Sequence, residues 1–176
     1  MFIDLLRSRR SIRQFENRPV EQEKVDLLIE AALRSPSSRG LDPWEFIVVT
    51  DTDIVRQLSE AKAHGSKFMK NATLAFVVLA DPERSDVWVE DTSIASIILH
   101  LAAHDLDLGS CWVQIRNRTH DSGEPSEDYI KKLLDIKAGM VVEAVIAIGY
   151  PAEQKAGHDR SSLLDAKVFR ERYGKK

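Results

Sequence analysis

The chain is almost free of cysteine, because Cys111 is the only one among its 176 residues. A lone cysteine cannot form an intrachain disulfide or a cysteine metal cluster, which excludes a disulfide-stapled secreted domain and favours a reducing compartment. Long hydrophobic runs are also missing: the longest stretch without Asp, Glu, Lys or Arg, residues 92–104, is shorter than the ~18 residues that cross a bilayer. The amino terminus lacks the basic region and apolar core of a signal peptide. We therefore expect a soluble, cytoplasmic protein without a membrane partner.

The chain also has little net charge. The 25 Lys and Arg residues nearly balance the 28 Asp and Glu residues, which leaves a formal net charge of -3 at pH 7 and argues against a nucleic-acid partner. The Gly-x-Gly-x-x-Gly and P-loop patterns are absent, which removes the usual dinucleotide and NTPase interpretations. No repeat and no long Pro/Gly/Ser-rich linker divides the chain, so we expect a single domain over residues 1–176.

Hydrophobic spacing predicts three helices, over residues 21–34, 91–104 and 126–135. In the second helix, apolar residues recur at helical spacing: Ile94, Ile97, Ile98 and Leu101. We expect this helix to be long and mostly buried, with Asp91 or Thr92 as its N-cap.

Four short runs rich in β-branched and aromatic residues predict buried strands, over residues 44–50, 74–80, 111–115 and 140–149. Helices and strands alternate imperfectly, so the class is α+β or mixed α/β with a sheet of about four or five strands. The tail, residues 155–176, has 10 charged residues among 22 and only scattered apolar ones. We expect it to dock on another surface rather than to join the core.

Two segments could carry chemistry. Residues 7–13 gather four arginines with two serines, and arginine offers planar, bidentate donors that suit phosphate. A solvated basic surface is the alternative interpretation of that segment. Residues 35–44 form a loop of small residues with two prolines, which a flat ligand could approach closely. An ordinary connection between a helix and a strand is the alternative there.

Taken together and in this order, these segments resemble the nitroreductase family of FMN-dependent oxidoreductases. The family opens with an Arg-(Arg/His)-Ser-x-(Arg/Lys)-x-Phe element, matched here by Arg9, Arg10, Ser11, Arg13 and Phe15. A Pro-Ser loop that ends in Pro-Trp follows, matched here by Pro36, Ser37, Pro43 and Trp44. Further resemblance lies in residues 108–112, in residues 149–151 and in a tail that carries Arg160.

The resemblance implies an α+β, three-layer sandwich with a central, mostly antiparallel sheet flanked by helices. It also implies an intertwined homodimer with two FMN sites at the subunit interface and with the tail, residues 155–176, docked on the partner. The implied activity is ping-pong hydride transfer through FMN, from NADH or NADPH to nitroaromatic, quinone or related small electron acceptors. A non-catalytic flavin- or nucleotide-binding sensor, and a specialised flavin reaction such as dehalogenation, are the alternatives.

The family's site residues carry over to four groups of positions in this sequence. The FMN phosphate and pyrimidine edge map onto Arg9, Arg10, Ser11 and Arg13, with Arg13 as the candidate cation that tunes the flavin. The loop contributed by the partner subunit maps onto Pro36, Ser37 and Ser38, with Arg39 and Gly40 as neighbours. The flavin edge near N5 maps onto Cys111, Trp112 and Val113. The basic group of the tail maps onto His158 and Arg160.

Two departures from the family pattern bear on the site. Gly40 stands where many members have Asn and Asp42 where many have Gln, so we expect altered hydrogen bonding to flavin or substrate. Residues 116–125 are the candidate lid. Cys111 is expected to be a small buried hydrophobe rather than a nucleophile, and no metal site is expected because His100 and His104 lack a third ligand.

Overall fold

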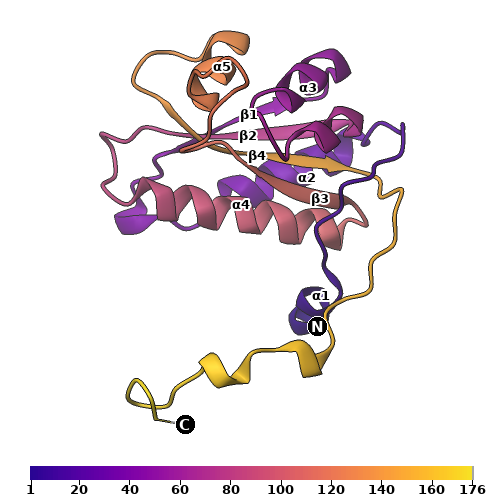
Figure 1. Ribbon diagram of the computed structural model, residues 1–176, viewed down its shortest axis with the longest axis vertical. Coiled ribbons are helices and arrows are strands. Elements are labelled where there is room, and N and C mark those ends of the chain that lie inside the picture. Colours follow the sequence, from indigo (N-terminus) through magenta and orange to yellow (C-terminus); the bar gives the residue numbers. More distant parts are fainter. Residues whose placement is uncertain (176) are drawn as a thin grey trace.

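The computed structural model describes residues 1–175 and contains one four-stranded sheet in the order β1-β2-β4-β3 (Figure 1). The strands are β1 (Trp44–Val49), β2 (Leu74–Ala80), β3 (Gly109–Gln114) and β4 (Val141–Gly149). Every neighbouring pair is antiparallel, which confirms the predicted mostly antiparallel sheet and resolves the class as α+β. All four predicted strands are present. The third begins two residues earlier than predicted because Gly109 already pairs with Gly149.

Helices cover both faces of this sheet and complete the predicted three-layer sandwich. Figure 1 shows α2 and α4 on one face and α3 and α5 on the other. The bounds are α1 (Phe2–Ser8), α2 (Gln22–Leu33), α3 (Thr52–Ser59), α4 (Trp88–Asp105) and α5 (Ser126–Leu133). The three predicted helices correspond to α2, α4 and α5, whereas α1 and α3 were not predicted. None of the helices in the described part of the chain combines the length and the apolar composition needed to cross a membrane.

Side chains of β2 divide the core between the two faces, because successive residues of a strand point to opposite sides. Leu74 and Phe76 pack with α2 and α4, whereas Ala75 and Val77 pack with α3, α5 and the 3-10 turn Lys67–Asn71. All seven residues of β2 are buried. The sheet is therefore covered on both faces around its centre.

The buried face of α4 is not the one that the apolar spacing predicts. Ile94 and Ile97 are 39% and 43% exposed. The face turned to the protein interior is built from small and polar residues together with one leucine: Thr92, Ala95, Ser96, Leu99, His100 and Ala103. The hydroxyls of Thr92 and Ser96 donate to main-chain carbonyls one turn earlier, at 2.8 Å each, so they are buried without loss of hydrogen bonding. The expectation that the isoleucine face would be buried is wrong for Ile94 and Ile97.

The predicted N-cap of α4 is also wrong. The helix begins at Trp88 with Val87 as its N-cap, so Asp91 and Thr92 lie inside its first turns. The Asp91 carboxylate is 2% exposed and binds other segments rather than the start of its own helix.

Helix α1 and the tail lie outside the three layers, along the side on which α4 lies (Figure 1). The apolar residues of the tail are open to solvent in a single chain, with Leu163, Leu164 and Val168 between 51% and 65% exposed. That exposure agrees with the expectation that the tail docks on another surface, although its docking on a partner subunit stays a prediction.

Candidate functional site

The arginine segment, residues 7–13, lies beside β3, the strand at the edge of the sheet. Ile12 donates its main-chain N–H to the Ser110 carbonyl at 3.0 Å, and Ser11 forms a bridge to the same residue. A side chain at Gly109 would place its Cβ 2.8 Å from Ile12, a distance that real Cβ atoms essentially never show. The absence of a side chain at Gly109 therefore allows the segment to lie directly on β3.

The base of the tail is bound to this segment. Arg10 donates to the Ala156 carbonyl, and the Lys155 ammonium lies 3.1 Å from the Ser11 carbonyl and 2.8 Å from a Glu153 carboxylate oxygen. The same carboxylate accepts the main-chain N–H of Arg13. This bond, followed by the bond from Lys155, lowers the pKa of Glu153, so the group is a carboxylate at neutral pH. Segments some 140 positions apart thus form one unit.

In the described part of the chain, this unit contains several cations that form no ion pair. Within residues 1–175, none of the guanidinium groups of Arg9, Arg10 and Arg13 forms an ion pair with a carboxylate, whereas Arg7 pairs with Asp4 at 2.9 Å. A cavity of about 490 Å³ opens beside Arg10, and its charged lining also includes Lys155, Glu153 and Asp107. Guanidinium and hydroxyl donors without carboxylate partners are the donor set that suits a phosphorylated ligand.

Cys111 lies on β3, next to Ser110, to which the arginine segment is bound. The residue is 2% exposed, and burial raises the pKa of its thiol against the opposing effect of the Arg13 and Lys155 cations. The thiol is therefore protonated at neutral pH, which agrees with the interpretation of Cys111 as a small buried hydrophobe. Val113, two residues along the strand, is also buried and packs with the α3 and α5 side of the core.

Trp112 faces the other side of the sheet. It packs with the α2 and α4 side of the core, and its indole N–H donates to Gln114 at 2.9 Å. Cys111 and Val113 therefore share one face of β3, and Trp112 projects from the opposite one. Of the three residues predicted at the flavin edge, Trp112 differs from the other two in this respect.

The Pro36–Gly40 loop is held by α4. Asp91 accepts the main-chain N–H of Ser38 at 2.8 Å and the hydroxyl of Ser85 at 3.0 Å. Asp42, which was expected to alter hydrogen bonding at the site, accepts a hydrogen bond from the Ser37 hydroxyl at 2.6 Å. Gly40 has φ +63°, the left-handed conformation that glycine adopts without strain, and nothing lies within 4 Å of the position where a Cβ would be. The side chain of Asp42 is therefore used to shape the loop.

The loop and the arginine segment do not meet within one chain. The loop is attached to α4 at Asp91, and the arginine segment is attached near the other end of that helix, where Ser8 lies 2.7 Å from the His104 ring. These two attachment points are 13 residues apart on the helix, which is about 20 Å at 1.5 Å per residue. A single chain therefore brings together Arg9, Arg10, Ser11, Arg13 and Cys111, but not the residues of the loop.

The basic residues of the tail lie next to α1. His158 and Arg160 line a cavity of about 530 Å³ together with Arg7. Arg160 is paired with Asp165 at 3.0 Å. The close approach requires glycine at Gly157, because a Cβ there would lie 1.9 Å from the Arg7 carbonyl oxygen. The tail therefore returns to the start of the arginine segment, although Arg160 is already engaged.

Both histidines of the i, i+4 pair on α4 lie within hydrogen-bond distance of a serine hydroxyl. The ring of His100 lies 2.7 Å from the Ser110 hydroxyl, and the ring of His104 lies 2.7 Å from that of Ser8. Burial, followed by the nearby Arg9 cation, lowers the pKa of His100 to about 4. Within residues 1–175 no three His, Cys, Asp or Glu side chains are arranged to hold a metal ion.

Three residues of the site were missed by sequence reasoning: Glu153, Lys155 and Lys62. The first two lie a few residues after the Gly149–Pro151 match, but nothing in their local sequence reveals that they return to residues 11–14. Lys62 is bonded through its carbonyl to Ser66, two residues before the Phe68 ring that lies under Arg13, and no sequence signal marks it.

The protein is an α+β sandwich whose arginine segment contacts the base of the tail. The arginines that form no ion pair there offer donors that suit a phosphorylated ligand. The family model for the nitroreductase family matches residues 6–67 and 55–150, and the chain belongs to that family. An FMN-dependent nitroreductase from Clostridium difficile R20291 is similar in structure, with TM-score 0.95 and 45% identity over 97% of this chain and 99% of that one.

Two further relatives differ in how much of the chain they match. A protein of Archaeoglobus fulgidus, provisionally named NADH dehydrogenase/NAD(P)H nitroreductase, is 33% identical over 97% of this chain and 98% of its own length. Iodotyrosine deiodinase 1 of Rattus norvegicus is 42% identical over only 59 residues, which is 34% of this chain and 21% of that protein.

Proposed function

We propose that the chain forms a cytoplasmic, homodimeric, FMN-dependent oxidoreductase that uses NADH or NADPH to reduce nitroaromatic, quinone or related small oxidised compounds. The observation that carries this proposal is the set of unpaired guanidinium groups of Arg9, Arg10 and Arg13 gathered beside Ser11 and Cys111. The 45% identity to an FMN-dependent nitroreductase over nearly the whole chain supports it. The short deiodinase match gives no ground for preferring dehalogenation.

In this proposal, the arginine segment and the tail bind the phosphate of FMN. Arg9 and Arg10 supply bidentate donors, Ser11 supplies a neutral one, and His158 and Arg160 approach from the tail. When bound, FMN supplies the redox chemistry, so the protein has no need of its own acid–base pair.

Arg13 and the β3 face have a second role. Arg13 is close enough to Cys111 to act on its thiol, so its guanidinium places a positive charge beside the strand that would support the ring. That charge stabilises negative charge on the pyrimidine edge. Cys111 and Val113 are uncharged and buried, so they add no opposing charge on that side of the strand.

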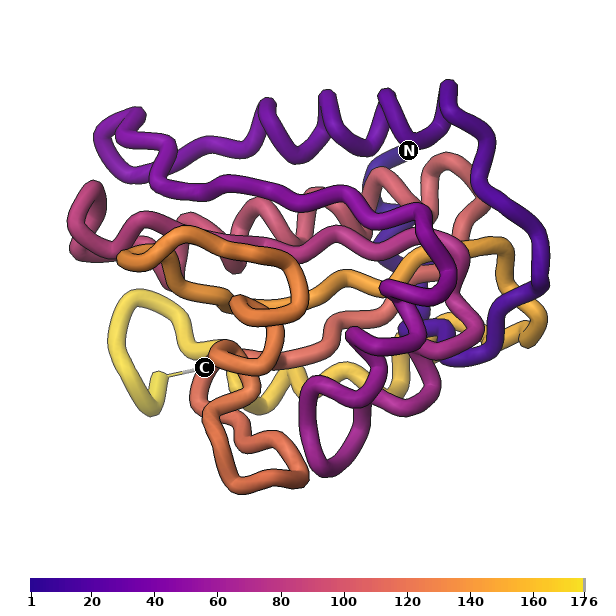
Figure 2. Tube along the Cα trace, turned by 90° about the horizontal axis from the view of Figure 1, so that it is seen from above, coloured from indigo at the N-terminus to yellow at the C-terminus, as the bar shows by residue number. Residues whose placement is uncertain are grey.

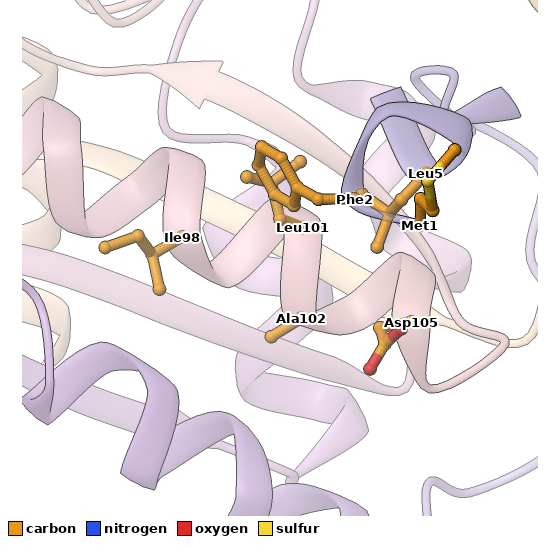
Figure 3. Close-up of a pocket in the computed structure, with 7 residues that line it drawn as sticks. All are labelled: Met1, Phe2, Leu5, Ile98, Leu101, Ala102 and Asp105. Carbon is orange, nitrogen blue, oxygen red and sulfur yellow. The ribbon is translucent and has the colours of Figure 1, made fainter. Parts of the chain in front are cut away.

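A second copy of the chain completes the site in this proposal. The Pro36–Gly40 loop is attached about 20 Å along α4 from the arginine segment, so the loop that covers the flavin comes from the partner subunit. Exposed apolar faces mark protein interfaces, and α4 carries one at Ile94 and Ile97. The face continues into an apolar cavity of about 520 Å³ between the start of the chain and α4, shown in Figure 3. Its apolar lining is Met1, Phe2, Leu5, Ile98, Leu101 and Ala102.

The activity is tested with purified protein titrated with FMN and then assayed for anaerobic oxidation of NADH and NADPH. Turnover that depends on nitrofurazone or menadione is expected. A protein that gains no flavin absorbance contradicts the proposal, and FMN binding without turnover identifies a sensor instead. Arg13→Gln should weaken FMN binding, whereas Arg34→Gln, which removes an exposed guanidinium paired with Glu30, should not.

The dimer is tested at Ile97. Ile97→Glu places a charge on the apolar face of α4 and should give a monomer in sedimentation analysis, with FMN binding lost in parallel. Ile97→Leu keeps the face apolar and should remain dimeric with flavin bound. A monomeric Ile97→Glu variant that binds FMN as tightly as the wild type would contradict a site shared between subunits.

A further inference from the structure

Two loops next to the β3 end of the sheet bring a pair of cations together. Figure 2 shows the loop that follows α3 and the loop that follows β3 side by side. The main-chain N–H of Ala63 donates to the Thr119 carbonyl at 3.1 Å and joins them. The second loop is fixed in turn by a bond from Ser126 to the Arg118 carbonyl at 2.9 Å. Lys62 and Arg118 are thus neighbours of this joint, one on each loop.

Neither cation is neutralised by an acid. Within the part of the chain that the structure describes, Lys62 forms no ion pair, and Arg118 donates only to the carbonyl of the preceding residue at 3.1 Å. Burial, followed by the Arg118 cation, lowers the pKa of Lys62. Glu60 pairs with Lys67 and Glu124 pairs with Lys132, and the remaining acid of the two loops, Asp121, forms no ion pair with Lys62 or Arg118 within residues 1–175. Two like charges therefore lie on two joined loops, and neither forms an ion pair within the described residues.

The pair adjoins the proposed flavin site through the segment that carries Lys62. The Ser66 hydroxyl donates to the Lys62 carbonyl at 3.2 Å, and two residues further the Phe68 ring lies under the Arg13 guanidinium, 5.7 Å from its Cζ to the ring centroid. Burial raises the pKa of the Cys111 thiol, so this group is uncharged at neutral pH and cannot neutralise the lysine. Lys62 and Arg118 come from segments that take no part in the phosphate-binding unit of residues 9–13 and 153–157.

We infer that Lys62 and Arg118 form an anion subsite that recognises a phosphate or carboxylate group on the molecule that exchanges electrons with the flavin. The shared chemistry is an anionic oxygen group, and its source is either the 2′-phosphate of NADPH or the carboxylate of an acidic acceptor. A guanidinium and an ammonium together match the charge of such a group. The inference rests on the proposed function, because it assigns substrate selectivity to the same site.

Matched substrates test the subsite. NADPH is compared with NADH, and 4-nitrobenzoate with the neutral 4-nitrobenzamide, for wild type, Lys62→Gln and Arg118→Gln. Loss of one charge should lower kcat/KM about tenfold for the anionic member of one pair and less than about twofold for its neutral partner. A fall confined to NADPH identifies the reductant as the source of the anion, and a fall confined to 4-nitrobenzoate identifies the acceptor. The control is Lys67→Gln, in the same region and paired with Glu60, which should change neither ratio.

Equilibrium binding provides a readout that does not depend on turnover. Calorimetry should show that wild type binds 2′,5′-ADP more tightly than 5′-AMP, or 4-nitrobenzoate more tightly than 4-nitrobenzamide, and that both glutamine variants abolish the difference. Variants that lower kcat/KM equally for all four substrates, or for none, would overturn the inference. Absence of FMN binding and turnover in the wild type counts against the proposed function, whereas turnover without charge selectivity counts against the subsite alone.

Discussion

Asp91 fixes the loop that the proposed site takes from its partner, and its removal should destabilise the protein measurably. The carboxylate is 2% exposed, and its two oxygens accept from the Ser38 main chain at 2.8 Å and from the Ser85 hydroxyl at 3.0 Å. Replacement by alanine leaves both donors without this acceptor. The residue also lies in the first turn of α4, where the helix dipole favours a negative charge.

The expected loss follows from these contacts. A hydrogen bond to a charged group contributes about 1.5–3 kcal/mol, so two such bonds would give roughly 3–6 kcal/mol. Part of that sum is offset because alanine no longer requires a charge to be buried. We therefore expect Asp91→Ala to lower the free energy of unfolding by about 3 kcal/mol, which corresponds to about 6–12 °C in Tm for a chain of this size. Asp91→Asn keeps one acceptor oxygen and should lose about half as much.

Urea denaturation followed by tryptophan fluorescence measures this loss, and the chain offers a matched control. Asp86 holds the same loop from the surface, through an ion pair with Arg39 at 2.7 Å in which both side chains are largely exposed. Asp86→Ala should cost less than about 1 kcal/mol. FMN affinity should fall with Asp91→Ala and not with Asp86→Ala. If the two variants were equally stable, the buried carboxylate would not be what holds the loop.

Three further predictions concern packing and protonation. Gly109→Ala puts a Cβ 2.8 Å from Ile12 and should displace the arginine segment, so FMN titration should give at least about a tenfold weaker affinity; an unchanged affinity would contradict the role of that segment. His100 has its pKa lowered to about 4, so between pH 6.5 and 4 the unfolded chain binds more protons than the folded one, and the free energy of unfolding should fall by about 3 kcal/mol as the pH is lowered through this window. His100→Gln should lose that pH dependence in urea denaturation, and a parallel dependence in both proteins would refute the assignment. Leu99→Ala should cost about 2–5 kcal/mol, and a loss below about 1 kcal/mol would contradict the burial of the Leu99 face of α4.

The two central strands, β2 and β4, could be predicted because their residues are buried on both faces. All of β2 and nearly all of β4 are buried, so their sequences are continuous apolar runs that indicate strands whatever the tertiary partners are. The short helix α3 was missed although its signal is present, since Asp51 caps it by accepting from Asp53 and Ile54. Helix α1 buries none of its residues in the core. Its sequence therefore lacks the pattern of core-facing apolar residues by which the other helices were predicted.

The inward face of α4 could not be predicted from spacing alone. Its sequence contains one stripe of isoleucines and another of small residues with Leu99, and either could pack on a sheet. In a single chain the sheet takes the stripe of small residues and leaves Ile94 and Ile97 exposed. The arginines of the candidate site could be predicted from sequence because they are close together in the chain. Glu153, Lys155 and Lys62 could not, because their roles arise from contacts made across the fold.

The position of the isoleucines explains how one helix can serve both halves of the proposed site. The loop is attached to α4 at Asp91 and the arginine segment at His104, and residues 97 and 98 lie midway between them. In the proposed homodimer, an isologous contact centred on those residues, with its two-fold axis perpendicular to α4, makes the two α4 helices antiparallel. The Asp91 end of one helix then lies beside the His104 end of the other, which brings the loop of each chain to the arginines of its partner across a distance that neither chain can close alone. The same geometry requires that Ile97→Glu abolish dimerisation and FMN binding together, since a site contained within one subunit would keep the flavin after the dimer has separated.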